Sequence, residues 1–251
     1  MGVVVAAAFA AGWVDAVVGG GGLVLIPVML ASTGLSPAGA LATNKATAIA
    51  GTASAAITMV RRVGVPRHTW AYAVIAGVLA ACGALAVSIV PAEIVRPLII
   101  VLLLAVGVFV ALRPSFGTEA GAPTVTPRRV ALGGLLVAAI GFYDGVFGPG
   151  TGMFIIMGLT SIFSQAFLRS AAMAKVINVA TNIGALAVFI AGGFVVWKLV
   201  IVLAVANVLG AQLGARTALK GGSTLVRWAL LVLVVVLCAR LGWQEMHNSL
   251  S

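Results

Sequence analysis

The chain is poor in charged and chemically reactive side chains. Only 8% of its 251 residues are charged, with five acidic residues, two histidines and two cysteines. Soluble domains carry roughly a quarter charged residues, so this scarcity excludes an ordinary soluble protein. Cys82 and Cys238 fall in apolar stretches with no His or Cys at metal-ligand spacing, and packing is the simplest interpretation of both. No nucleophile has a base beside it, so we expect no enzyme, no metal and no cofactor.

Apolar residues make up most of what remains. They account for 62% of the chain, and the mean hydropathy is +1.22. These values predict an all-α polytopic membrane protein. The formal charge of +10 would suggest nucleic acid in a soluble protein. Here the basic residues lie mostly in short connections between apolar segments, as the positive-inside rule requires, so we expect a lipid bilayer and no nucleic acid as the partner.

The apolar segments form two similar sets separated by a polar connection. Uninterrupted segments approach the ~20 residues that a bilayer core requires. The segments are 3–32, 38–60, 69–90, 94–112, 130–163, 167–191, 195–218 and 224–242. The connection contains several prolines and glycines, which mark it as a linker. We therefore expect one integral membrane domain, built from a first repeat (1–112), a linker (113–129) and a second repeat (130–251).

A glycine-rich motif occurs once in each repeat. Both copies read Gly-x-x-Asp-x-x-x-Gly followed by further glycines, at Gly12–Gly22 and at Gly141–Gly152. Glycine at this density interrupts a helix and leaves backbone N–H and C=O groups unpaired. In a membrane such groups are tolerated only where protein or a water-filled cavity covers them. The two breaks therefore predict the binding site of a membrane transporter.

The two repeats are expected to have opposite orientations. A shift of 130 positions places Lys45 on Lys175, and a shift of 129 places Asp15 on Asp144. Each broken segment is longer than one crossing needs, which favours two short half-helices in a re-entrant hairpin. This arrangement also gathers the loop cations more strongly on one face than full crossings would. Three plain crossings per repeat then invert the second repeat and place both termini outside the cytoplasm.

Four ionisable residues lie inside the apolar segments: Asp15, Lys45, Asp144 and Lys175. Each costs several kcal/mol in a membrane unless it faces a cavity or a partner, which makes it a functional candidate. Lysines beside half-helix N-termini suit an anion. The predicted substrate-binding residues are Gly19, Gly20, Gly21, Gly22, Thr43, Asn44, Lys45, Gly148, Gly150, Thr151, Gly152, Lys175 and Asn178. Thr52 and Asn182 lie two turns after the lysines, near the same helix faces.

Simpler interpretations remain open for these residues. Lys45 and Lys175 could extend to the membrane interface. Asp15 and Asp144 could cap a helix, pair with a lysine or titrate in proton coupling. The glycines could serve only close helix packing. A second functional alternative is a transporter or channel for a cation or neutral metabolite that uses the two aspartates as ligands.

The motifs resemble those of the sulfite exporter TauE/SafE family (TSUP). In the first repeat the resembling residues are Gly12, Asp15, Gly19–Gly22, Pro27 and Thr43–Lys45. In the second they are Phe142–Gly145, Gly148–Gly152, Lys175, Asn178, Gly210, Gly214 and Arg216. The Thr-Asn pair before Lys45 has no counterpart before Lys175, where Ala172–Ala174 stands instead.

The resemblance implies a multi-pass carrier of the bacterial inner membrane. It would move sulfite or small organosulfur anions such as sulfoacetate, generally outward, by alternating access. The exact cargo, the direction, the coupling ion and the choice between monomer and homodimer stay open at this point.

Overall fold

The computed structural model describes residues 1–86 and 124–249, and every regular element in these residues is an α-helix. The helices are α1 (Gly2–Val18), α2 (Gly21–Thr33), α3 (Pro37–Val63), α4 (His68–Ala86), α6 (Pro127–Val146), α7 (Thr151–Phe163), α8 (Phe167–Ala191) and α9 (Trp197–Ser249). Four helical stretches are long and apolar enough to cross a membrane: His68–Ala86, Pro127–Val146, Phe167–Ala191 and Trp197–Ala229. The predicted all-α polytopic class is confirmed. The predicted segment 94–112 and most of the linker lie outside the described residues.

Both glycine motifs interrupt the helix where the sequence predicts a break. Gly19 ends α1 in the left-handed conformation, with φ 79°, and α2 begins two residues later. In the second motif Gly148 and Gly150 have φ 82° and 83° and separate α6 from α7. Only glycine adopts this region without a steric penalty, which explains its density at both breaks.

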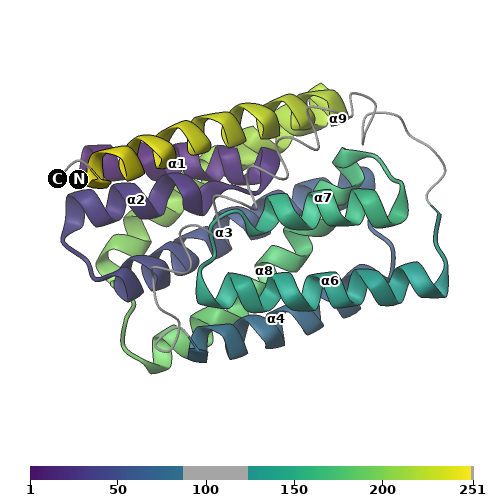
Figure 1. The fold of residues 1–251 in the computed structure, drawn as a ribbon, viewed down its shortest axis with the longest axis horizontal. Helices are drawn as coiled ribbons and strands as arrows, with labels where there is room; N and C mark the ends of the chain where they lie inside the picture. Colours follow the sequence, from purple (N-terminus) through teal and green to yellow (C-terminus); the bar gives the residue numbers. More distant parts are fainter. Residues whose placement is uncertain (87–123, 250–251) are drawn as a thin grey trace.

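Each break joins two antiparallel helices into a hairpin (Figure 1), and the two hairpins enter from opposite ends of the molecule. The two helices of each hairpin differ in length more than the sequence suggests. α2 and α7 have 13 residues each, but α1 has 17 and α6 has 20. At ~1.5 Å per residue α6 alone approaches the thickness of a bilayer core. The expectation of two short half-helices therefore holds only for the second helix of each hairpin, α2 and α7, because the glycines come late in each apolar segment.

Helices of the two repeats interlock. α9 packs along α1 and α3, while α4 packs along α6 and α8. Small residues make the close approach: a Cβ on Gly214 would lie 2.5 Å from the Trp13 carbonyl oxygen, and one on Gly141 would lie 2.6 Å from that of Ala76. Glycine at such contacts lets membrane helices approach backbone to backbone. Each broken hairpin is thus supported by a helix from the other repeat.

The last helix is interrupted at Gly222, which has φ 63° and ψ −161°. This residue lies between the predicted segments 195–218 and 224–242. After it the chain turns back, so the start of α1 and the end of α9 lie at the same end of the molecule (Figure 1). Any even number of crossings gives this arrangement, and both the re-entrant hairpins and the side of the membrane stay predictions.

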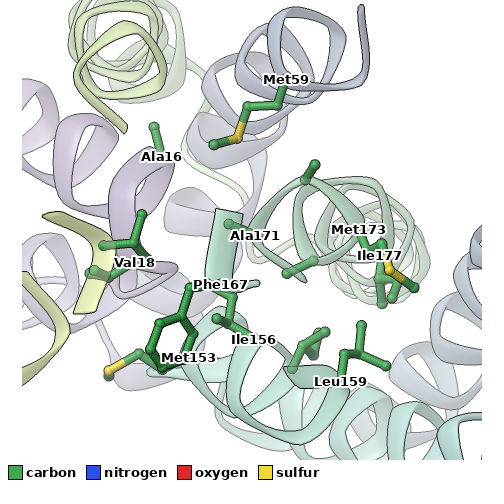
Figure 2. Packing of buried hydrophobic residues seen from close by; sticks show 14 of the residues in the cluster. Ala16, Val18, Met59, Met153, Ile156, Leu159, Phe167, Ala171, Met173 and Ile177 are labelled. Carbon is green, nitrogen blue, oxygen red and sulfur yellow. The ribbon is translucent and has the colours of Figure 1, made fainter. Parts of the chain in front are cut away.

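The main hydrophobic cluster lies beside the breaks and joins both repeats. The cluster includes Val18 of α1, Met153 and Ile156 of α7 and Met173 of α8, all buried (Figure 2). The packing interpretation of Cys82 is wrong, because this residue is exposed on α4. Its position on an apolar helix indicates contact with lipid instead of protein. The side chain of Cys238 lies outside the described part of the chain.

Candidate functional site

The four intramembrane charges form two ion pairs, and each pair joins the two repeats. Lys45 Nζ lies 2.8 Å from Asp144 Oδ2, and Lys175 Nζ lies 3.4 Å from Asp15 Oδ2. The lysines come from α3 and α8, and the aspartates from the last turns of α6 and α1. A lysine of one repeat is therefore neutralised by the aspartate of the other.

Both lysines end inside the protein and do not extend to the membrane interface. Lys45 is 1% exposed and Lys175 is fully buried. The helix that carries Lys45 starts at Pro37, after the N-cap Ser36, whose hydroxyl accepts a hydrogen bond from Gly39 N. Lys45 therefore lies in the third turn of this helix. A buried ammonium without a partner is strongly unfavourable, and the paired carboxylates remove most of that cost.

The Lys45–Asp144 pair is fully enclosed. Both oxygens of Asp144 are occupied, since Thr151 Oγ1 donates to Oδ1 at 2.7 Å while Lys45 binds Oδ2. Lys45 also donates to Asn182 Oδ1 at 3.5 Å. Thr151 is the first residue of α7, so its hydroxyl ties the start of that helix to Asp144. Asp144 thus has both oxygens bonded, whereas the Lys45 ammonium has one N–H that neither of these bonds uses.

The Lys175–Asp15 pair is more open. The Asp15 side chain remains 17% exposed, and Thr52 Oγ1 donates to its Oδ2 at 3.0 Å. Within the described residues the hydrogen bonds to this carboxylate fall on Oδ2 alone. Lys175 Nζ also donates to the main-chain carbonyl of Asp15. The ammonium is thus held by the backbone as well as by the carboxylate.

The two glycine breaks meet each other beside these pairs. A Cβ on Gly19 would overlap Gly152 Cα and lie 2.9 Å from Met153 N, and one on Gly22 would lie 3.8 Å from Pro149 Cα. Neither α2 nor α7 has a side-chain cap at its N-terminus. Leu23 N and Thr151 N bond to the backbone carbonyls of Gly20 and Gly148. The other first-turn N–H groups and the positive ends of two helix dipoles lie where the two breaks meet.

Two asparagines flank these helix starts. Asn178 Nδ2 lies 2.9 Å from the position of a Cβ on Gly152, and Asn44 Nδ2 lies 3.5 Å from that on Gly22. Asn178 is 5% exposed, and its Oδ1 has no hydrogen-bond partner among the described residues. A buried amide oxygen without a partner indicates a missing hydrogen-bond donor, such as a water molecule.

Not every predicted residue joins this arrangement. The Thr43 hydroxyl instead accepts a hydrogen bond from Val196 N at 3.2 Å, just before α9. Gly21 packs within its own hairpin, where a Cβ would lie 2.7 Å from the Ala11 carbonyl oxygen. Tyr143 lies within the second motif without being one of the predicted site residues, and its hydroxyl donates to Pro149 O at 2.7 Å and shapes the second break. Its only sequence signal is its place next to Asp144.

The apolar helices and enclosed charges define a polytopic membrane transporter, and comparison with known proteins gives its family. The chain belongs to the sulfite exporter TauE/SafE family, whose model matches residues 4–241. It is 36% identical over 236 residues to the probable membrane transporter protein ORF9 of Sinorhizobium sp., covering 94% of this chain and 89% of that protein.

Two further relatives carry equally general names. The probable membrane transporter protein YfcA of Escherichia coli strain K12 is 36% identical over 244 residues, covering 96% of this chain and 89% of YfcA. A probable membrane transporter protein of Haemophilus influenzae is 34% identical over 239 residues, covering 94% of this chain and 92% of the relative. No solved structure matches the chain significantly. These names give the transporter class but not the cargo.

Proposed function

We propose that this protein is a secondary transporter of sulfite or small organosulfur anions in the bacterial inner membrane, and that it works chiefly as an exporter. The observation that carries the proposal is the meeting of two buried lysines with two uncapped helix N-termini from opposite repeats. Sulfur oxyanions present several acceptor oxygens to such donors. The Asn178 amide nitrogen, which lies beside Gly152 at the start of α7, is a further donor for such an oxyanion.

The way the helices pack supports alternating access. α1, α2, α3 and α9 form one packed unit, α4, α6, α7 and α8 form another, and α3 packs along α8 where the two units meet. Both ion pairs and the contact between Gly19 and Gly152 cross from one unit to the other. Each of these units contains helices of both sequence repeats. We propose that the two units rock against each other around the site, and that the sequence repeats do not move as separate bodies.

A cation or neutral-metabolite transporter remains the second candidate. It would use Asp15 and Asp144 as ligands, and both carboxylates do face the breaks. Each is already bonded to an ammonium, however, so a cation would have to displace a lysine from each. An anion needs no such displacement at the helix N-termini, which favours the first proposal.

Ligand-dependent thermal stability separates the two candidates. Purified protein in detergent is heated with sulfite, thiosulfate or ethanesulfonate, and separately with Na⁺ or divalent cations. A ligand that binds the native state alone raises the unfolding temperature in a concentration-dependent way. We expect at least one sulfur oxyanion to do so at concentrations where matched chloride does not. If only a cation stabilised the protein, the cation transporter would be favoured over the anion transporter.

A further inference from the structure

Charge balance within the candidate site constrains what can travel with the cargo. In the described site two ammonium groups are matched by two carboxylates, so the four intramembrane charges sum to zero. A monoanion added to this neutral set would leave one uncompensated negative charge in a low-dielectric environment. Binding therefore requires one compensating positive charge.

We propose that this charge is a proton taken up by Asp15, so that one proton and one monoanion cross together. The inference rests on the proposed function, because it assumes that the site carries an anion. Asp15 is assigned in place of Asp144 because the two carboxylates differ in their surroundings. Asp144 is 3% exposed and both of its oxygens are occupied, whereas the Asp15 side chain is 17% exposed and its hydrogen bonds fall on one oxygen.

The contacts of Asp15 allow its carboxylate to take up a proton, and an anion to replace it as a partner of Lys175, without loss of local structure. In the empty state Lys175 Nζ faces Asp15 Oδ2 and also donates to the Asp15 main-chain carbonyl. When a proton from the aqueous side binds the carboxylate, the ammonium keeps its backbone acceptor. An oxygen of the anion then takes the place of Oδ2 as the second acceptor of Lys175.

The Thr52 hydroxyl can form a hydrogen bond with Asp15 whether that carboxyl group is ionised or protonated. Its hydroxyl donates to Asp15 Oδ2 in the present structure at 3.0 Å. A hydroxyl can also accept a hydrogen bond, so the same group can accept from the protonated carboxyl. Asn178, one turn after Lys175, offers an amide beside the position that the anion would occupy.

Among residues 1–86 and 124–249, no charge other than that of Lys175 is in contact with Asp15. Lys175 of α8 is the ionisable side chain that touches it, and the group that α3 contributes is the neutral Thr52. α2 and α7 carry no ionisable residue. Where α9 packs closely on α1, it presents Asn207, Gly210 and Gly214.

A proton that travels with the anion also sets the direction of flux. The loaded carrier is neutral, so the membrane potential does not drive it, whereas a pH gradient does. An interior more alkaline by one pH unit balances about a tenfold accumulation of the monoanion inside. Under this pH gradient, outward transport therefore requires a ratio of cytoplasmic to external cargo concentration above about tenfold.

Proteoliposomes test the coupling. Vesicles loaded with a pH-sensitive dye receive ethanesulfonate or sulfite, and valinomycin with K⁺ gradients imposes a membrane potential of either sign. With wild-type protein we expect the lumen to acidify as ethanesulfonate enters, and the initial rate for either anion to be unchanged by the potential. Potential-dependent flux without acidification would overturn the inference. Absence of flux for both anions would instead contradict the proposed function.

Two variants at Asp15 assign the proton to this residue. Asp15→Asn leaves the empty site with one net positive charge, so the empty carrier becomes charged, and its flux should change several-fold with the sign of the potential. Asp15→Glu retains an ionisable carboxyl and should keep potential-independent flux. Potential-independent flux in a folded Asp15→Asn protein would refute the assignment. If Asp15→Asn does not fold, the wild-type measurement and Asp15→Glu still decide the coupling.

Discussion

Gly19→Ala tests whether the two glycine breaks really pack against each other. The added methyl group would overlap Gly152 Cα and lie 2.9 Å from Met153 N, both backbone atoms that cannot move without shifting α7. Gly19 also has φ 79°, where an alanine is strained. Two separate penalties therefore act at this position.

Gly34→Ala isolates one of the two penalties. Gly34 ends α2 with φ 65°, and nothing lies within 4 Å of the position that its Cβ would occupy. The left-handed conformation costs about 1–2 kcal/mol for alanine at either glycine. Overpacking adds about 1–3 kcal/mol at Gly19 alone, for a total near ~3 kcal/mol. At about 2–4 °C per kcal/mol, Gly19→Ala should unfold roughly 5 °C below Gly34→Ala.

The assay is thermal unfolding of both variants and wild type in the same detergent, followed by intrinsic fluorescence. We expect the order wild type, Gly34→Ala, Gly19→Ala from most to least stable. Equal losses for the two glycine variants would refute the packing of the first break on the second, and with it the combined site.

Two further changes test contacts between the packed units and within one of them. Lys45→Met should cost about 3–5 kcal/mol because it leaves the Asp144 carboxylate buried without a counter-charge, and adding Asp144→Asn should restore most of this stability. A double variant as unstable as the sum of the single variants would exclude coupling between these residues. Tyr72→Phe removes the 2.6 Å hydrogen bond to Val130 O that ties α4 to α6, and should lower the free energy of unfolding by about 1 kcal/mol. An unchanged unfolding temperature would show that this bond does not support the unit.

The sequence predicted the features that depend on local chemistry. The helix breaks fall at Gly19 and at Gly148–Gly150 because glycine density and positive φ go together. Thr52 and Asn182 were placed near the faces of the lysine helices by periodicity, and each contacts one of the ion pairs.

The pairing of charges could not be predicted in the same way. Asp15 and Lys45 belong to one repeat, yet each bonds to the charge of the other repeat. Alignment of the two repeats shows which residues correspond. It does not show that α9 packs along α1 or that α4 packs along α6. The lipid-facing position of Cys82 was missed for a related reason, since a uniformly apolar helix has no polar face to indicate which side is buried.

Flux through a folded protein that lacks one lysine tests the central claim most directly. The Lys45→Met/Asp144→Asn double variant removes one ammonium without leaving a buried charge, and Gly34→Ala serves as the control away from the breaks. In proteoliposomes with sulfite and ethanesulfonate, we predict saturable flux for wild type and for Gly34→Ala, and loss of flux for the folded double variant. Wild-type rates in the double variant, or no flux of either anion in wild type, would contradict the account.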